Sequence, residues 1–172
     1  ADKTILNNQY SDIAGEFIGF PKENTIDLTV RPKELRINIA PQYFQKIKQK
    51  RSSALEKGFL FTDIDDYVPT EIRFEDQIYN GRIRLKGDLI DNLNRGNKWS
   101  YRVKLRGNNT ILGMKQFSLH HPKVRGGISE WVFFEALKKE KGIALRYFFV
   151  RVILNGKDVG IYALEEHFEK RL

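Results

Sequence analysis

The chain has 172 residues, 41% of them hydrophobic and 30% charged, which is enough apolar content to fill a core and excludes a disordered chain. It has no cysteine, which excludes disulfides, thiolate catalysis and zinc sites built on Cys, and no apolar run of about 18 residues for a membrane span. The net charge of +8 is concentrated in residues 80–126, with 11 Lys and Arg against 2 Asp and Glu, so a phosphate-bearing or acidic partner is expected.

The first third of the chain predicts two strands and a helix. Period-two alternation favours strands at 25–30 and 35–39, joined by a turn at 31–34. Pro41 opens a predicted helix that runs to about Lys57 and ends at Gly58. We interpret residues 1–66 as a small β-hairpin and helix extension of the region that follows.

The next stretch turns to β-structure. Strands are predicted at 69–75, 78–87, 99–106 and 114–120. Asn80-Gly81 and residues 106–109 supply residues typical of turns.

A helix and a hairpin complete the chain. Ser129 is a suitable N-cap for a helix over 130–141, with Trp131 in its buried stripe and Gly142 at its end. Strands at 146–154 and 159–164 follow, joined by the hairpin signal Asn155-Gly156, and a last helix is predicted from Glu165. In the second half of the chain the order is β-β-β-α-β-β, which predicts an α+β fold, an antiparallel sheet with a packed helix, and disfavours a doubly wound sheet.

The charged residues of the central block alternate along two predicted strands. Arg82, Arg84 and Lys86 share one face of the first strand, and Ser100, Arg102, Lys104 and Arg106 share one face of the second. Pairing these strands places like charges opposite one another, which is unfavourable without an anion nearby. The alternative is an ordinary solvated face of an antiparallel sheet.

Two other motifs give weaker indications of function. The loop from Gly87 to Lys98 contains glycines near both ends and can approach phosphates, although an ordinary hairpin is the better explanation of its spacing. Adjacent histidines on a strand point to opposite faces, so His120 and His121 do not predict a metal site.

These pieces, in their order, resemble the CotH kinase family of spore-coat proteins. The correspondence covers roughly residues 67–172 and rests on four segments: Lys86-Gly87-Asp88, Lys98-Trp99-Ser100-Tyr101, Leu112-Gly113-Met114-Lys115 and the hairpin from Asn155-Gly156 to Glu165. The family usually has Arg and Asn where this chain has Lys86 and Asp88, and a second Lys in place of Trp99. The resemblance therefore points to a divergent member.

The resemblance implies a kinase-like N-lobe over residues 67–172 and phosphoryl transfer from ATP with Mg²⁺ or Mn²⁺ to a surface protein. It implies nucleotide contacts from a set of loop and strand residues: Lys86, Gly87, Arg95, Lys98, Arg102, Lys104 and Lys115. Glu130 or Glu135 would be the helix acid that pairs with a lysine, and Glu165 would mark the hinge. Catalytic and metal-binding aspartates would lie in a C-lobe beyond Leu172, so this chain alone is expected to be inactive.

Location and partners remain expectations. The resemblance implies an exported or cell-surface protein, and the chain begins at Ala1 without a signal sequence, as a processed or recloned fragment would. A non-catalytic module that docks an anionic surface polymer or protein is the alternative function. Nucleic acid is disfavoured because Trp99 and Tyr101 alternate away from the basic face, whereas single-strand binders place aromatic and basic residues together.

Overall fold

The computed structural model describes residues 31–87, 92–94, 96 and 98–167. The chain divides into two compact units, Ala1–Arg31 and Pro32–Leu172, and nearly all described residues belong to the second. The strand predicted at 25–30 and the candidate residue Arg95 lie outside the described residues.

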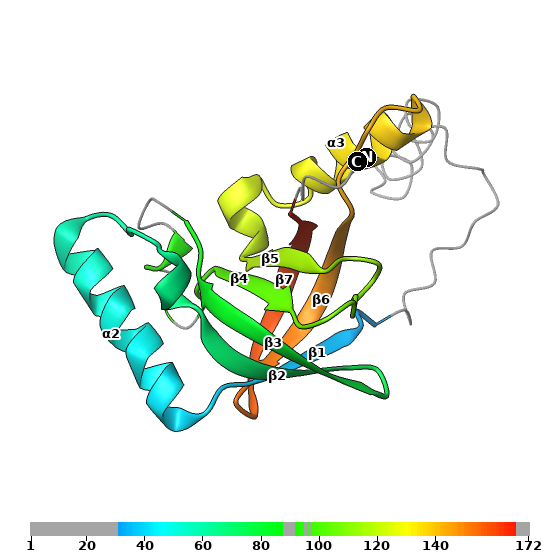
Figure 1. Cartoon of the computed structure of the whole chain (residues 1–172). Helices are drawn as coiled ribbons and strands as arrows, with labels where there is room; N and C mark the ends of the chain where they lie inside the picture. The colour runs from blue at the N-terminus through cyan, green and yellow to red at the C-terminus, as the bar shows by residue number, and fades with distance from the viewer. Residues whose placement is uncertain (1–30, 88–91, 95, 97, 168–172) are drawn as a thin grey trace, which may run out of the picture. The chain divides into compact units, whose positions relative to one another are not determined.

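The second unit is built on a closed barrel of seven strands in the order β1-β2-β3-β4-β5-β7-β6 (Figure 1). Its strands are β1 (Glu34–Asn38), β2 (Val68–Phe74), β3 (Gln77–Leu85), β4 (Tyr101–Leu105), β5 (Gln116–His120), β6 (Tyr147–Leu154) and β7 (Lys157–Glu166). Neighbouring strands are antiparallel except β1 and β6, whose parallel pairing closes the barrel. Closure gives every strand two neighbours, so the sheet has no free edge.

The prediction of an α+β kinase-like N-lobe with a small N-terminal extension is therefore wrong. β1 is not an extension, because Ile37 pairs with Ile72 of β2 on one side and with Leu154 of β6 on the other. Local periodicity identified the strand correctly at 35–39 but carries no information on such distant pairings. The described residues therefore form a mixed barrel with two α-helices on its outside.

Alternation along the strands fills the barrel. The burial pattern of β2 alternates strictly between buried and exposed residues over its seven positions. The largest fully buried side chains include three tyrosines, a phenylalanine, a methionine and several aliphatic residues. They are Tyr101, Tyr147, Tyr162, Phe117, Met114, Leu35, Ile37, Ile72 and Ile83. The hydrophobic effect of this apolar surface is the main term that stabilises the fold.

Helix α2 (Pro41–Lys57) has the predicted bounds. Gly58 ends it in the left-handed conformation, at a φ of 80°, which glycine adopts without strain. Ile47 and Ala54 are buried, so the helix lies against the barrel through one stripe, as Figure 1 shows at the side of β3. Of the helices in the described ranges, none is long and apolar enough to cross a membrane.

Helix α3 (Ser129–Lys139) was also predicted, but the prediction that one stripe of it is buried is wrong. None of its residues is buried, and Trp131 and Phe133 are 38% and 59% exposed. The N-cap prediction was wrong as well: Ile128 occupies that position, and Ser129 Oγ donates a hydrogen bond to the Gly126 carbonyl at 2.9 Å. Two short 3₁₀ helices, η1 (Ile64–Asp66) and η3 (Pro122–Arg125), complete the description.

The β6–β7 hairpin confirms a turn prediction and corrects a helix prediction. Asn155 and Gly156 form the turn with φ of 48° and 78°, as an Asn-Gly hairpin requires. β7, however, continues to Glu166, so the helix predicted from Glu165 is a strand at that point. Pairing of Glu165 with Ser118 of β5 holds the chain extended there.

Asn80-Gly81 is not a turn but lies inside β3, and the β2–β3 hairpin turns at Glu75 and Asp76. Glycine is needed at position 81 for a different reason. A Cβ built on Gly81 would lie 2.9 Å from the Lys104 carbonyl of β4 and 3.5 Å from the Ile72 side chain.

We therefore expect Gly81→Ala to lower the free energy of unfolding by about 1–3 kcal/mol, because strand β4 must move to make room. Chemical denaturation monitored by circular dichroism measures this change. Gly107→Ala is not a suitable control because Gly107 has a positive φ, so the matched variant is Asn80→Ala at the exposed neighbour, which should change stability little. Equal stability of Gly81→Ala and wild type would contradict the close approach.

Candidate functional site

The two basic strands pair as the sequence predicted. Arg82 lies opposite Lys104 and Arg84 lies opposite Arg102 in the antiparallel register of β3 and β4. The alternating residues Tyr101 and Val103 are buried in the barrel, so the cations stand on its outer face. Like charges directly opposite one another are destabilising unless a carboxylate of the protein or an external anion lies nearby.

Arg84 and Arg102 are partly covered by the protein. The Arg84 guanidinium lies 5.1 Å from the centre of the Tyr67 ring, and its Nη1 donates to the Leu85 carbonyl at 2.9 Å. Burial lowers the pKa of the Arg102 guanidinium, and the nearby charge of Arg84 lowers it further. Arg102 Nη1 also contacts Nδ1 of His167. The Nε atoms of Arg84 and Arg102 are buried and have no hydrogen-bond partner within the described residues.

Glu165 supplies negative charge to this part of the face. The barrel register aligns Arg102, Ser118 and Glu165 in one row across β4, β5 and β7. Glu165 Oε2 lies 3.0 Å from Lys86 Nζ and 3.8 Å from Nδ1 of His120, and its residue is only 8% exposed. The cations at this end of the basic face thus have an internal carboxylate beside them.

His120 extends this polar cluster towards α3. Its Nε2 lies 3.8 Å from Glu130 Oε2 and 3.3 Å from the Tyr147 hydroxyl, and the side chain is 1% exposed. Such a buried, hydrogen-bonded arrangement fixes the end of β5 to α3 and β6. The cluster of Lys86, Glu165, His120 and Glu130 is best explained as structural.

The other end of the basic face forms an open groove of about 610 Å³. Its cations are Arg82, Lys104, Arg106 and Lys115, and the rest of its lining is neutral: Ile64, Tyr67, Leu105, Gly107, Asn108 and Gln116. We call this site the basic groove. Among the described residues that line it there is no carboxylate, and none of its four cations forms an ion pair within the described part of the chain.

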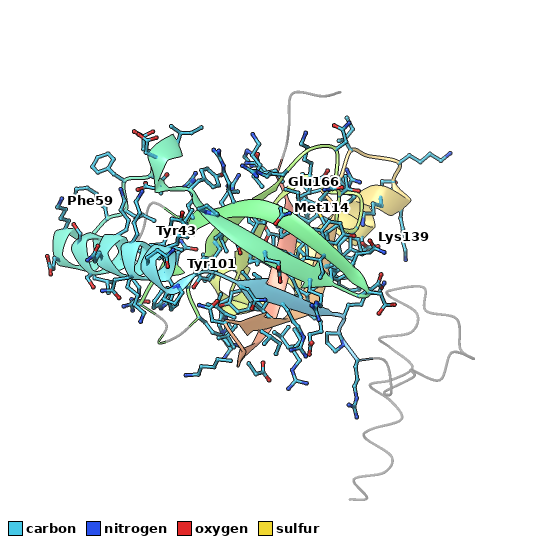
Figure 2. The ribbon with its side chains drawn as sticks, turned by 60° about the horizontal axis from the view of Figure 1, so that its bottom comes forward. Tyr43, Phe59, Tyr101, Met114, Lys139 and Glu166 are labelled. Atoms are coloured by element: carbon cyan, nitrogen blue, oxygen red, sulfur yellow. The ribbon has the colours of Figure 1, made fainter. Side chains whose placement is uncertain are left out.

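The loop between β4 and β5 brings Lys115 beside Lys104. The Leu105 N–H donates to the Lys115 carbonyl at 2.9 Å, and Ile111 and Met114 bridge the two sides of the loop. Both Ile111 and Met114 are 1% exposed, which anchors the loop to the core; Met114 is labelled in Figure 2. The groove is therefore held by fixed backbone on both sides.

The structure brings together only some of the residues that the resemblance assigned to a nucleotide. Lys104 and Lys115 share the basic groove, and Arg102 precedes Lys104 by two positions on the same face. Lys86 and Glu165 instead pair with each other. Gly87 has a φ of 111°, and the Asn92 side chain occupies the space that a Cβ at position 87 would need.

Lys98 and Glu135 lie apart from the groove. Lys98 Nζ is 6.0 Å from the Tyr162 ring centre and 3.5 Å from the Ile161 carbonyl, beside β7. Glu135 pairs with Lys138 on the surface of α3 at 2.6 Å, and Glu130, the other candidate helix acid, lies beside His120.

Arg82 and Arg106 are groove residues that the choice of candidates missed. Alternation had placed Arg82 and Arg106 on the same faces as Arg84 and Lys104, so a signal for both existed. Two contacts between β3 and β4 bring these arginines to the groove. The strand pairing puts Arg82 beside Lys104, and the Arg106 N–H donates a hydrogen bond to the Asn80 carbonyl.

Comparison with known proteins finds no protein-family model and no curated protein that matches this chain. The described residues also contain no group of three or more His, Asp or Glu side chains arranged to hold a metal ion. The site is thus characterised by its own geometry: four cations line a groove whose other residues are neutral.

Proposed function

We propose that this chain is a binding module that docks an anionic polymer, or an acidic segment of a protein, in the basic groove. The observation that carries the proposal is that four cations converge in the basic groove without a carboxylate among its described lining. Elsewhere on the same face, at Lys86 and Arg102, an internal carboxylate is present. An external anion would relieve the repulsion that the groove retains.

The exposure of the groove cations favours a ligand with several charges. The groove is open to solvent along the surface of β3 and β4, and three of its cations, Arg82, Lys104 and Arg106, are exposed. An open site with several dispersed cations suits a ligand with repeated charges, because many modest contacts add up along a polymer. Arginines favour bidentate contacts with phosphate or carboxylate groups.

Nucleotide binding is a second candidate and stays a prediction. Lys104 and Lys115, both assigned to ATP by resemblance, do share the groove, and the Tyr67 ring forms part of its wall. The groove cations suit phosphate groups, but no described carboxylate lines the groove to hold Mg²⁺ or Mn²⁺, so the phosphates would have to carry the metal. Phosphoryl transfer to a surface protein and an exported location also stay predictions.

Titration of inorganic polyphosphate by isothermal calorimetry, at several salt concentrations, tests the proposal. We expect saturable binding whose logarithmic dependence on salt becomes shallower by about one for each groove lysine replaced in Lys104→Gln and Lys115→Gln. The double variant should bind about tenfold or more weakly at low salt. Lys98→Gln is the matched control, since Lys98 lies beside β7 and should not matter.

The same variants separate the two candidate functions. ATP with Mg²⁺ at millimolar concentration should not raise the unfolding temperature of the wild-type chain if the ligand is a polymer. A rise that Lys104→Gln abolishes would favour the nucleotide. Equal loss of polyphosphate binding in Lys98→Gln and in the double variant would show that general surface charge, not the groove, binds the anion.

A further inference from the structure

Helix α3 and the residues beside it expose large apolar side chains to solvent. No residue of the helix is buried. Five large hydrophobic side chains on the helix or next to its ends are between 38% and 73% exposed: Ile128, Trp131, Val132, Phe133 and Ile143. Exposed apolar side chains that gather in one place commonly mark a surface that contacts a partner or a membrane.

The opposite side of α3 holds the helix against the barrel. Glu130, Phe134 and Leu137 recur at helical intervals and are half-buried. The Phe134 ring centre lies 5.9 Å from that of Tyr147 on β6, and Glu130 Oε2 lies 3.8 Å from Nε2 of His120 on β5. These contacts fix which side of the helix faces outwards.

The outward side of α3 is an apolar stripe. Ile128, Val132 and Ala136 are exposed and follow one another at intervals of four residues, so they lie in one row along the helix. Trp131 and Phe133 border this row on its two sides, and we call these five residues the α3 apolar surface. Figure 1 shows α3 at one end of the barrel, away from α2.

Cations accompany the α3 apolar surface. Residues 121–146 carry six Lys and Arg against three Glu. Two of the three carboxylates have internal contacts, since Glu130 lies beside His120 and Glu135 pairs with Lys138 at 2.6 Å. The third, Glu140, is exposed. Three exposed lysines of this segment form no ion pair within the described part of the chain: Lys123, Lys139, which is labelled in Figure 2, and Lys141.

We infer that α3 docks this protein on the surface of a lipid bilayer that carries anionic headgroups. A helix with an apolar stripe that contains Trp and Phe, and with lysines beside it, has the composition of helices that lie in the membrane interface. Val132 and Phe133 enter the boundary between headgroups and acyl chains, and Trp131 lies at the headgroup level, where its amphipathic ring is favoured. Lys139 and Lys141 contact the lipid phosphates, which makes the charge of the segment complementary to the bilayer.

This surface shares no residue with the basic groove, so the inference does not depend on the proposed polymer ligand. Both sites attract anions, but only the α3 apolar surface combines its cations with a row of exposed apolar side chains. The two sites therefore differ in the variants that should impair them.

Co-sedimentation of the full chain with phosphatidylcholine vesicles that contain about one third phosphatidylglycerol tests the inference. We expect the wild-type chain to sediment with these vesicles at millimolar lipid and much less with vesicles of phosphatidylcholine alone. Val132→Ser combined with Phe133→Ser should weaken binding about tenfold or more, because the apolar contact is lost. Lys139→Gln combined with Lys141→Gln should weaken it by a similar factor.

Tryptophan fluorescence reports whether α3 enters the bilayer. The chain has two tryptophans, of which Trp131 is 38% exposed and Trp99 is 9% exposed. The anionic vesicles should shift the emission to shorter wavelength. Trp131→Phe should abolish this shift but still sediment with the vesicles, because the variant keeps an aromatic side chain at that position.

Matched variants elsewhere on the chain serve as controls. Phe61→Ser replaces an apolar side chain that is 75% exposed outside α3 and should leave vesicle binding unchanged. Lys104→Gln combined with Lys115→Gln removes the same charge from the basic groove and should also leave it unchanged, while it weakens polyphosphate binding. Because the lysines of α3 are exposed, their double variant tests the site even if thermal unfolding shows that the apolar double variant does not fold.

Several results would overturn the inference. They are no sedimentation of wild type, equal sedimentation with neutral vesicles, no loss in either α3 double variant, or an equal loss in Phe61→Ser or in the groove variant. An emission shift that persists in Trp131→Phe would also contradict insertion of α3. A dimer in the absence of lipid that Val132→Ser with Phe133→Ser dissociates would assign the apolar surface to a second copy of the chain instead.

Discussion

Replacing Ile37 with alanine is expected to lower the free energy of unfolding by about 2–5 kcal/mol, the range for deleting a large aliphatic side chain from a packed core. Ile37 is 0% exposed and lies on β1, between Ile72 of β2 and Leu154 of β6. The loss should be large because β1 is the strand that closes the barrel. Urea denaturation with two-state analysis measures it.

The neighbouring variant Arg36→Ala provides the control for Ile37. Arg36 is exposed on the same strand and, within the part of the chain that the structure describes, forms an ion pair only with Glu34, at 2.6 Å. Such a pair contributes about 1 kcal/mol or less. If Ile37→Ala were no more destabilising than Arg36→Ala, β1 would be a peripheral extension, as the sequence had suggested, and the closed barrel would be wrong.

Glu165→Ala is expected to be the most damaging single change outside the apolar core. It removes the carboxylate that lies 3.0 Å from Lys86 and 3.8 Å from His120, in a part of the barrel where Arg102 is also half-buried. Removing one partner of a buried ion pair typically costs about 3–5 kcal/mol, because the other charge is left without compensation. Thermal and urea unfolding measure the change.

Two further variants give this prediction its specificity. Glu75→Gln breaks an exposed pair with Lys33, whose side chains are both 56% exposed, and should cost about 1 kcal/mol or less. Combining Glu165→Ala with Lys86→Met should recover part of the loss, since the uncompensated cation is then absent. A Glu165→Ala chain as stable as wild type would mean that the row of polar residues across β4, β5 and β7 does not support the fold.

Local patterns in the sequence predicted most elements but not their assembly. Helix α2 and the strands that became β2 to β6 were found within a few residues of their bounds, because alternation and helix-ending glycines are local signals. The parallel pairing of β1 with β6 joins residues more than a hundred positions apart, and no local signal specifies it. That pairing is what turns a sheet into a barrel.

The same distinction between local and long-range signals holds for the basic face. Alternation correctly placed Arg82 and Lys104 on the outer face of their strands and Tyr101 on the buried face, so a basic face was predictable. Which cations would be compensated was not predictable, because Glu165 reaches Lys86 only through the neighbouring β5 and β7 strands.

The claim that the basic groove is the anion site is tested most directly by a nuclear magnetic resonance titration of the ¹⁵N-labelled chain with polyphosphate. The largest shift changes are expected at the amides that line the groove, Gly107, Asn108 and Gln116. Amides of the lysine-rich face of α2, around Lys46 and Lys50, should change little. The largest changes on α2, or equal changes over all basic surfaces, would contradict the account.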